Sequence, residues 1–99
     1  MGLPHHQIAL MYYIYVIQNV NDETDFYLGY SADLRKRLDQ HNSGMNASTK
    51  GRTWRIAYYE AYQFKEFARA REAKLKRNKR MRQMLMQRVR EQFGGEGSS

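Results

Sequence analysis

A chain of 99 residues with a formal net charge of +7 predicts one compact, basic domain that could bind a polyanion. The hydrophobic fraction of 41% allows a modest core, but no apolar run reaches the roughly 20 residues that a membrane-spanning helix needs. Cysteine is absent, which excludes disulfides and cysteine-based zinc sites and fits a cytoplasmic location.

The N-terminal part of the chain predicts a β-hairpin. Met11 to Ile17 is aromatic and β-branched, and a second strand-like segment runs from Phe26 to Tyr30. The charged stretch at residues 21–25 between them is typical of a turn. Two strands joined in this way form a hairpin, and each of them carries a tyrosine.

A helix is predicted directly after the hairpin. Ser31 can cap its N-terminus, and Asp33 in the first turn suits the helix dipole. Leu34 and Leu38 then lie four residues apart, on one helical face. Gly44 is a natural residue at which to end the helix, because glycine adopts the left-handed conformation without strain.

The remainder of the chain predicts a third strand and two helices. A polar, irregular loop at residues 45–53 precedes a segment of strand-like composition, Trp54 to Tyr59. Phe64 to Lys76 is expected to be helical, with Asn78 as its break. Met81 to Val89 then forms a second, methionine-rich helix.

These elements predict an α+β domain over residues 11–93. The order β-β-α-β-α-α indicates a three-stranded antiparallel sheet flanked by helices. Residues 1–10 lack both the basic region and the apolar run of a secretory signal, so we expect a flexible extension there. Residues 94–99 contain only Gly, Ser and one Glu, which predicts a flexible tail.

Basic residues are concentrated in the C-terminal half. No Lys or Arg precedes Arg35, whereas residues 65–90 carry eleven, opposed only by Glu66 and Glu72. Such a density is typical of proteins that bind the nucleic-acid backbone. Two alternatives stay open: a solvated helical face, and an anionic membrane surface. The second is weaker, because Trp and Phe do not cluster opposite the charges.

Eight basic residues are candidate contacts to nucleic acid, and the polar loop residues Asn46, Ser48 and Thr49 could join them. The eight are Lys50, Arg52, Arg55, Arg69, Lys76, Arg77, Lys79 and Arg80. Backbone contacts of this kind give an affinity that falls steeply with salt. No helix resembles one that reads base edges, so we expect low specificity, or specificity supplied by a protein partner.

Two phenols, a guanidinium, an imidazole and a carboxylate could together hydrolyse a phosphodiester. They belong to Tyr15, Tyr27, Arg37, His41 and Glu72. A guanidinium can grip two phosphate oxygens, a carboxylate can hold hydrated Mg²⁺, and a phenol can accept a proton, although its usual pKa is near 10. The structural alternatives are strand aromatics, a surface arginine, a structural histidine, and a glutamate that pairs with Arg69, Arg71 or Lys76.

Each of the five residues lies in a short motif. The motifs follow in the order Tyr13-Ile14-Tyr15, Tyr27-Leu28-Gly29, Asp33-Leu34-Arg35-Lys36-Arg37-Leu38, His41-Asn42-Ser43-Gly44 and Ala70-Arg71-Glu72. With this order and spacing the chain resembles the GIY-YIG endonuclease domain, and most of all its small stand-alone bacterial members similar to the excinuclease C-subunit nuclease domain. The resemblance covers residues 11–89. Leu28 is a mild departure from the family's second triplet, and a late asparagine of the excinuclease members has no clear counterpart.

The resemblance implies a metal-dependent nuclease acting on DNA. It assigns Mg²⁺ (or Mn²⁺) to Glu72, the base to Tyr15 or Tyr27, transition-state stabilisation to Arg37, and orientation or proton relay to His41. No second carboxylate has a partnering position in the sequence, which favours one metal over two. We expect the two tyrosines, Arg37 and Glu72 to converge on one concave face of the sheet. An inactive nucleic-acid-binding module of the same fold is the alternative, and a small RNA- or ribosome-associated protein is a weaker third. The choice between DNA and RNA and the oligomeric state stay open.

Overall fold

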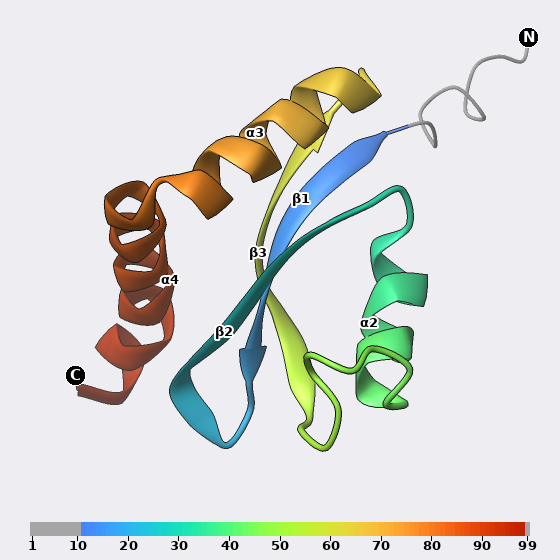
Figure 1. The fold of residues 1–99 in the computed structure, drawn as a ribbon. Helices are drawn as coiled ribbons and strands as arrows, with labels where there is room; N and C mark the ends of the chain where they lie inside the picture. The colour runs from blue at the N-terminus through green and yellow to red at the C-terminus, as the bar shows by residue number, and fades with distance from the viewer. Residues whose placement is uncertain (1–10, 99) are drawn as a thin grey trace, which may run out of the picture.

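The structure, a computed structural model, describes residues 11–98 and contains three strands and three helices (Figure 1). Their order confirms the predicted α+β class and the β-β-α-β-α-α arrangement. The extension expected at residues 1–10 lies outside the described residues. The elements are β1 (Tyr12–Asn19), β2 (Asp22–Ser31), α2 (Leu34–Asn42), β3 (Trp54–Tyr62), α3 (Lys65–Arg77) and α4 (Lys79–Ser98).

The sheet is antiparallel, with strand order β2-β1-β3, so β1 is central and β2 lies at an edge. Residues 14–17 of β1 are buried, as expected for a central strand covered on both faces. Successive side chains of a strand point to opposite faces. Ile14 and Val16 therefore face one layer of helices, and Tyr15 and Ile17 face the other.

Two separate cores hold these layers on the sheet. On one face, Ile14 and Val16 pack with Leu75 of α3 and Val89 of α4. On the other face, Tyr15 and Ile17 pack with Trp54 and with the partly buried leucines of α2. Accordingly α2 lies on one side of the sheet and α3 and α4 lie on the other (Figure 1).

The start of α2 differs from the prediction, whereas its end agrees. Asp33, not Ser31, caps the helix, and its carboxylate accepts a hydrogen bond from the Lys36 amide at 3.1 Å. Ser31 is the last residue of β2, and its hydroxyl is engaged by the Asp33 backbone at 2.9 Å. Gly44 follows the C-cap with a φ of +81°, and its amide donates to the carbonyl of His41, so the predicted glycine end is confirmed.

The strands and the last helix extend beyond their predicted bounds. β2 includes the charged residues from Asp22, which an edge strand can leave in water, and β3 continues to Tyr62 opposite Tyr12. Asn78 ends α3 as predicted, and its side chain then accepts from the Met81 amide at the start of α4. α4 continues to Ser98 instead of ending at Val89.

Helical backbone thus covers most of the segment for which a tail was predicted. The segment contains three glycines, and glycine has low helix propensity. The flexibility of residues 94–99 therefore stays a prediction. No helix within residues 11–98 is both long enough and apolar enough to cross a lipid bilayer.

Candidate active site

The register of the hairpin brings the two candidate phenols to one face. Tyr15 pairs across the sheet with Gly29, and Ile17 pairs with Tyr27. Directly opposed residues of an antiparallel pair point to the same side, so Tyr27 shares the face of Tyr15. A Cβ on Gly29 would lie 2.5 Å from the phenolic oxygen of Tyr15. The glycine of the second triplet is therefore required because the Tyr15 ring crosses the strand at that point.

His41, in the last turn of α2, joins the phenols from the helix side. Its side chain is fully buried, and Nε2 lies 2.7 Å from the Tyr15 hydroxyl. The imidazole and the Tyr27 ring are also in contact, with centroids 5.0 Å apart. Tyr15, the less exposed phenol, is only 1% exposed, whereas Tyr27 is partly open to solvent.

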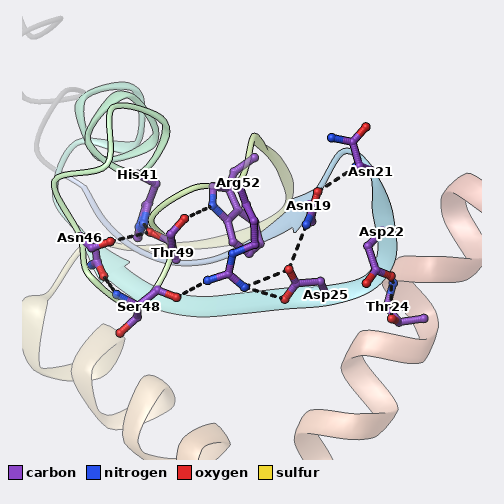
Figure 2. Close-up of polar contacts among 11 residues, drawn as sticks. Asn19, Asn21, Asp22, Thr24, Asp25, His41, Asn46, Ser48, Thr49 and Arg52 are labelled. Atoms are coloured by element: carbon purple, nitrogen blue, oxygen red, sulfur yellow. Dashed lines mark hydrogen bonds and ion pairs between the residues drawn. The ribbon is translucent and has the colours of Figure 1, made fainter.

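A buried threonine holds the other nitrogen of this imidazole. Thr49 Oγ1 lies 2.7 Å from His41 Nδ1, and the same hydroxyl donates to the carbonyl of Asn46 at 3.3 Å (Figure 2). Thr49 therefore accepts from Nδ1–H, which leaves Nε2 free to accept the proton of Tyr15. Thr49 was expected only as a surface residue of the polar loop, yet its side chain is fully buried. Its role depends on a partner eight residues away, for which the sequence carried no signal.

Electrostatics keep this pair in its neutral state. Burial raises the pKa of the Tyr15 phenol well above its usual value, the charges of Tyr27 and Glu72 add to the rise, and that of Arg37 opposes it. Burial also lowers the pKa of His41, and the positive charge of Arg37 lowers it further. The sequence left open whether burial or nearby cations would have the larger effect on the pKa of the two phenols. At Tyr15 burial dominates, so the phenol stays protonated near neutral pH.

Glu72 lies beside the edge strand β2. It forms ion pairs with Lys76 at 3.2 Å and Arg69 at 3.9 Å, two of the partners that the structural alternative named. The guanidinium of Arg69 stacks on Tyr30, and the Lys76 ammonium lies 6.0 Å from the centre of the Tyr27 ring. The three side chains of α3 therefore follow the C-terminal half of β2, with Arg69 at Tyr30, Lys76 near Tyr27 and Glu72 paired with both cations.

The geometric expectation for Glu72 needs a correction. Its helix, α3, packs through Ala68 and Leu75 on the face opposite to the tyrosines. The helix that carries Glu72 therefore lies on the other side of the sheet from α2, beside the edge strand β2. The charge of Glu72 is nonetheless close enough to act on the pKa of Tyr15.

The donor set suits a single hydrated cation. Within residues 11–98, no three His, Asp or Glu side chains gather in a cluster that could hold a metal ion. Mg²⁺ in phosphoryl-transfer sites commonly takes one or two carboxylates and completes its shell with water and substrate phosphate. The side chain of Glu72 is 14% exposed, and its carboxylate is of the type that such a site uses.

Two of the candidate contacts to nucleic acid are occupied by the protein itself. Arg52 pairs with Asp25 at 3.0 Å and donates to the carbonyl of Ser48, which fastens the polar loop to β2 (Figure 2). Arg55 donates twice to the Gln18 side chain, at 3.1 and 2.7 Å, and stacks on a ring of α4. Their partners lie 27 and 37 residues away, so the sequence did not indicate them.

The other six candidates fall into two groups. Arg69 and Lys76 flank Glu72, as described above. Lys50 and the residues around the turn between α3 and α4 have exposed side chains, and among the described residues none of them forms an ion pair; they are Lys50, Arg77, Lys79 and Arg80.

A second polar cluster, which sequence reasoning missed, anchors α3 to β3. Arg71 forms a two-fold hydrogen bond with Glu60, at 3.0 Å for each contact. Tyr58 and Tyr62 donate to the same carboxylate at 2.6 Å. Arg71 is therefore not a partner of Glu72, and its cluster fixes the helix that carries Glu72.

Comparison with known proteins agrees with this architecture. Residues 11–86 match the family described as the GIY-YIG catalytic domain. A UPF0213 protein of Streptococcus pyogenes serotype M3 is 43% identical over 75 residues, which are 74% of this chain and 79% of the relative. A UPF0213 protein of Streptococcus pneumoniae serotype 4 is 40% identical over 70 residues, 69% of each chain. The solution structure of a UPF0213 protein from Bacillus halodurans aligns with a TM-score of 0.49 and 28% identity, covering 79% of this chain and 84% of the other. The match of residues 11–86 to the family model shows that the chain belongs to the GIY-YIG family.

Proposed function

We propose that this protein is a nuclease that hydrolyses phosphodiester bonds in nucleic acid, with DNA as the expected substrate. One observation carries the proposal. In a member of the GIY-YIG family, the buried imidazole of His41 contacts the phenols of Tyr15 and Tyr27, and the charges of Arg37 and Glu72 both act on the pKa of Tyr15. An attacking water needs a proton acceptor, and the phosphate needs positive charge; this set supplies both.

Tyr15 and His41 form the proton path in this proposal. As water attacks phosphorus and the P–O bond to the leaving oxygen breaks, Tyr15 accepts the proton of the water and passes its own proton to His41 Nε2, 2.7 Å away. The leaving oxygen takes up a proton from solvent. Burial opposes a free Tyr15 phenolate, and a concerted transfer avoids that species. The lowered pKa of His41 keeps the imidazole neutral near pH 7, so it is available as the final acceptor.

Arg37 and Tyr27 act on the substrate. The positive charge of Arg37 acts on the pKa of both Tyr15 and His41, which supports the proposal that its guanidinium stabilises charge on the phosphate during attack. Tyr27 is the more accessible phenol and contacts the His41 ring. Its hydroxyl would orient the attacking water or a phosphate oxygen.

Glu72 is the residue that would hold Mg²⁺ or Mn²⁺. Bound there, the ion would neutralise charge on the scissile phosphate. Glu72 now pairs with Lys76 and Arg69, and these cations would turn to substrate phosphates once the carboxylate is engaged. The side chains of Lys76 and Arg69 therefore connect the candidate active site to the other basic residues of the C-terminal half.

Binding is expected to be electrostatic, weakly sequence-selective and steeply dependent on salt. Lys50, Arg77, Lys79 and Arg80 are the exposed cations proposed to contact phosphates. Arg52 and Arg55 are assigned a structural role instead, because the fold already engages them. A protein partner that supplies specificity and a cytoplasmic location both stay predictions.

A cleavage assay tests the proposed function. The purified chain is incubated with Mg²⁺ or Mn²⁺ on branched, flapped, single-stranded and duplex DNA and on matching RNA. Glu72→Gln should abolish cleavage, while Glu66→Gln on the exposed side of the same helix should cleave like the parent. Equal cleavage by the parent, Glu72→Gln and Glu66→Gln would assign the activity to a contaminant. If the parent cleaves nothing in the panel, the alternative of a binding module replaces the nuclease. The ion pair between Glu72 and Lys76 is the observation in favour of that alternative.

A further inference from the structure

A groove of about 930 Å³ runs between the edge strand β2 and helix α4. Tyr27 and Lys76 line it, and both also belong to the surroundings of Glu72 described above. The groove therefore lies on the side of β2 that faces α4, and Lys76, whose ammonium is 6.0 Å from the centre of the Tyr27 ring, connects it to the candidate active site. α4 contributes its far wall, through residues from Arg82 to Arg90.

The groove combines apolar and cationic side chains. Phe26 and Met86 are partly buried against the core of this face, and their remaining exposed parts provide an aromatic and a thioether surface in the groove. Lys76, Arg82 and Arg90 provide three positive charges, and among the described residues no carboxylate lines the groove. An aromatic platform in a positively charged groove is the arrangement by which proteins bind single-stranded nucleic acid, with bases stacked on the rings and phosphates on the cations.

Two of the cations contact other groups of the protein. Arg82 donates to the carbonyls of Leu75 and Lys76 at 2.9 and 3.0 Å, which ties α4 to the end of α3. Arg90 lies 3.5 Å from Glu23 at the rim, in an exposed pair that a phosphate can displace. Arg82 thus has a fixed position before any ligand binds, whereas Arg90 can turn from Glu23 to a phosphate.

We propose that this groove binds a single-stranded segment of the nucleic acid and leads it to Tyr27. A base must be unpaired to stack on Phe26, so a duplex cannot use the groove in this way. The inference rests on the proposed function. It narrows the substrate class to nucleic acid with a single-stranded arm, such as a flap or a fork, and it gives α4 the role of binding that arm.

Charge reversal within one helix provides the test. Gln83 and Gln87 are exposed, line the groove and lie one turn apart on α4. Gln92 is exposed on the same helix but does not line the groove. The variant Gln83→Glu/Gln87→Glu is compared with Gln92→Glu by fluorescence anisotropy, in EDTA, with a labelled oligothymidine and with a blunt duplex. Circular dichroism of each variant checks the fold.

The groove variant should bind the single strand roughly tenfold more weakly, since its added charges disfavour phosphate contacts. Its loss on the duplex should be smaller, and the control should stay within about twofold of the parent on both ligands. Equal affinity of the groove variant and the control for the single strand would overturn the proposal. So would an equal loss on single strand and duplex, because that indicates general electrostatics.

Phe26→Leu gives a second measurement that leaves the charge unchanged. Loss of stacking should weaken single-strand binding by about tenfold and leave duplex binding unchanged. The binding assays do not depend on cleavage. If the protein binds single strands through the groove but never cleaves, only the nuclease proposal is wrong. If the parent cleaves but the groove variants bind single strands as tightly as the parent, only the groove proposal is wrong.

Discussion

The hydroxyl of Thr49 should determine both the stability and the tautomer of His41. Thr49→Val keeps the shape of the side chain but removes the oxygen that lies 2.7 Å from Nδ1. A buried imidazole N–H without an acceptor costs about 1–3 kcal/mol, and full burial of both residues puts the expected loss near the middle of that range, about 2 kcal/mol. The tautomer should change as well, because Nε2–H can still find an acceptor in the Tyr15 oxygen.

The matched control is Thr53→Val, which makes the same substitution at an exposed residue of the same loop. Urea unfolding of the two variants gives the loss of stability, and ¹⁵N spectra of the imidazole report which nitrogen carries the proton. In the parent we expect the proton on Nδ1. In Thr49→Val we expect it on Nε2, with cleavage reduced because Nε2 no longer accepts from Tyr15. An unchanged tautomer, or equal stability of Thr49→Val and Thr53→Val, would refute the reasoning.

Three further predictions concern the same site. The pKa of His41 is lower in the folded chain than its usual value of about 6.5. The free energy of unfolding should therefore be independent of His41 above that pH and should decline as the pH falls from 6.5 toward the folded pKa. Urea unfolding at a series of pH values checks this, and the substitution His41→Gln should flatten the profile. Gly29→Ala should lower the free energy of unfolding by about 1–3 kcal/mol and should reduce cleavage, because the new methyl group displaces Tyr15. Thermal unfolding and the cleavage assay measure the two effects. A variant as stable as the parent would contradict the close contact. Tyr27→Phe should lose activity alone, and Glu72→Gln should lose activity with DNA affinity equal or slightly higher; a clear fall in affinity in either variant would argue against these assignments.

The sequence by itself determined the class, the order of the elements and the motif residues. β-Branched and aromatic runs predicted the strands, and leucine spacing and the glycine after α2 predicted that helix and its end. These signals succeed because they act locally: strand propensity, helical periodicity and the left-handed conformation of Gly44 depend on neighbouring residues. The motifs likewise identified the family, because their order and spacing are properties of the chain.

Local chemistry was insufficient where two residues competed for one role or where a partner lay far along the chain. Ser31 and Asp33 can both cap a helix, and the pairing of Ser31 with Tyr13 keeps Ser31 in β2, so the cap falls to Asp33. Arg52 and Arg55 have the composition of phosphate ligands, yet Asp25 and Gln18 engage them across the fold.

The tertiary structure also decided how the candidate site is assembled. Thr49 gains its role only because the loop folds back over α2 and excludes water from His41. Glu72 belongs to a helix on the other side of the sheet from α2, beside the edge strand β2, and Gly29 leaves room for the Tyr15 ring. Burial, not the nearby arginine, controls the proton on Tyr15. Packing sets which groups lose contact with water, and a sequence motif does not encode that quantity.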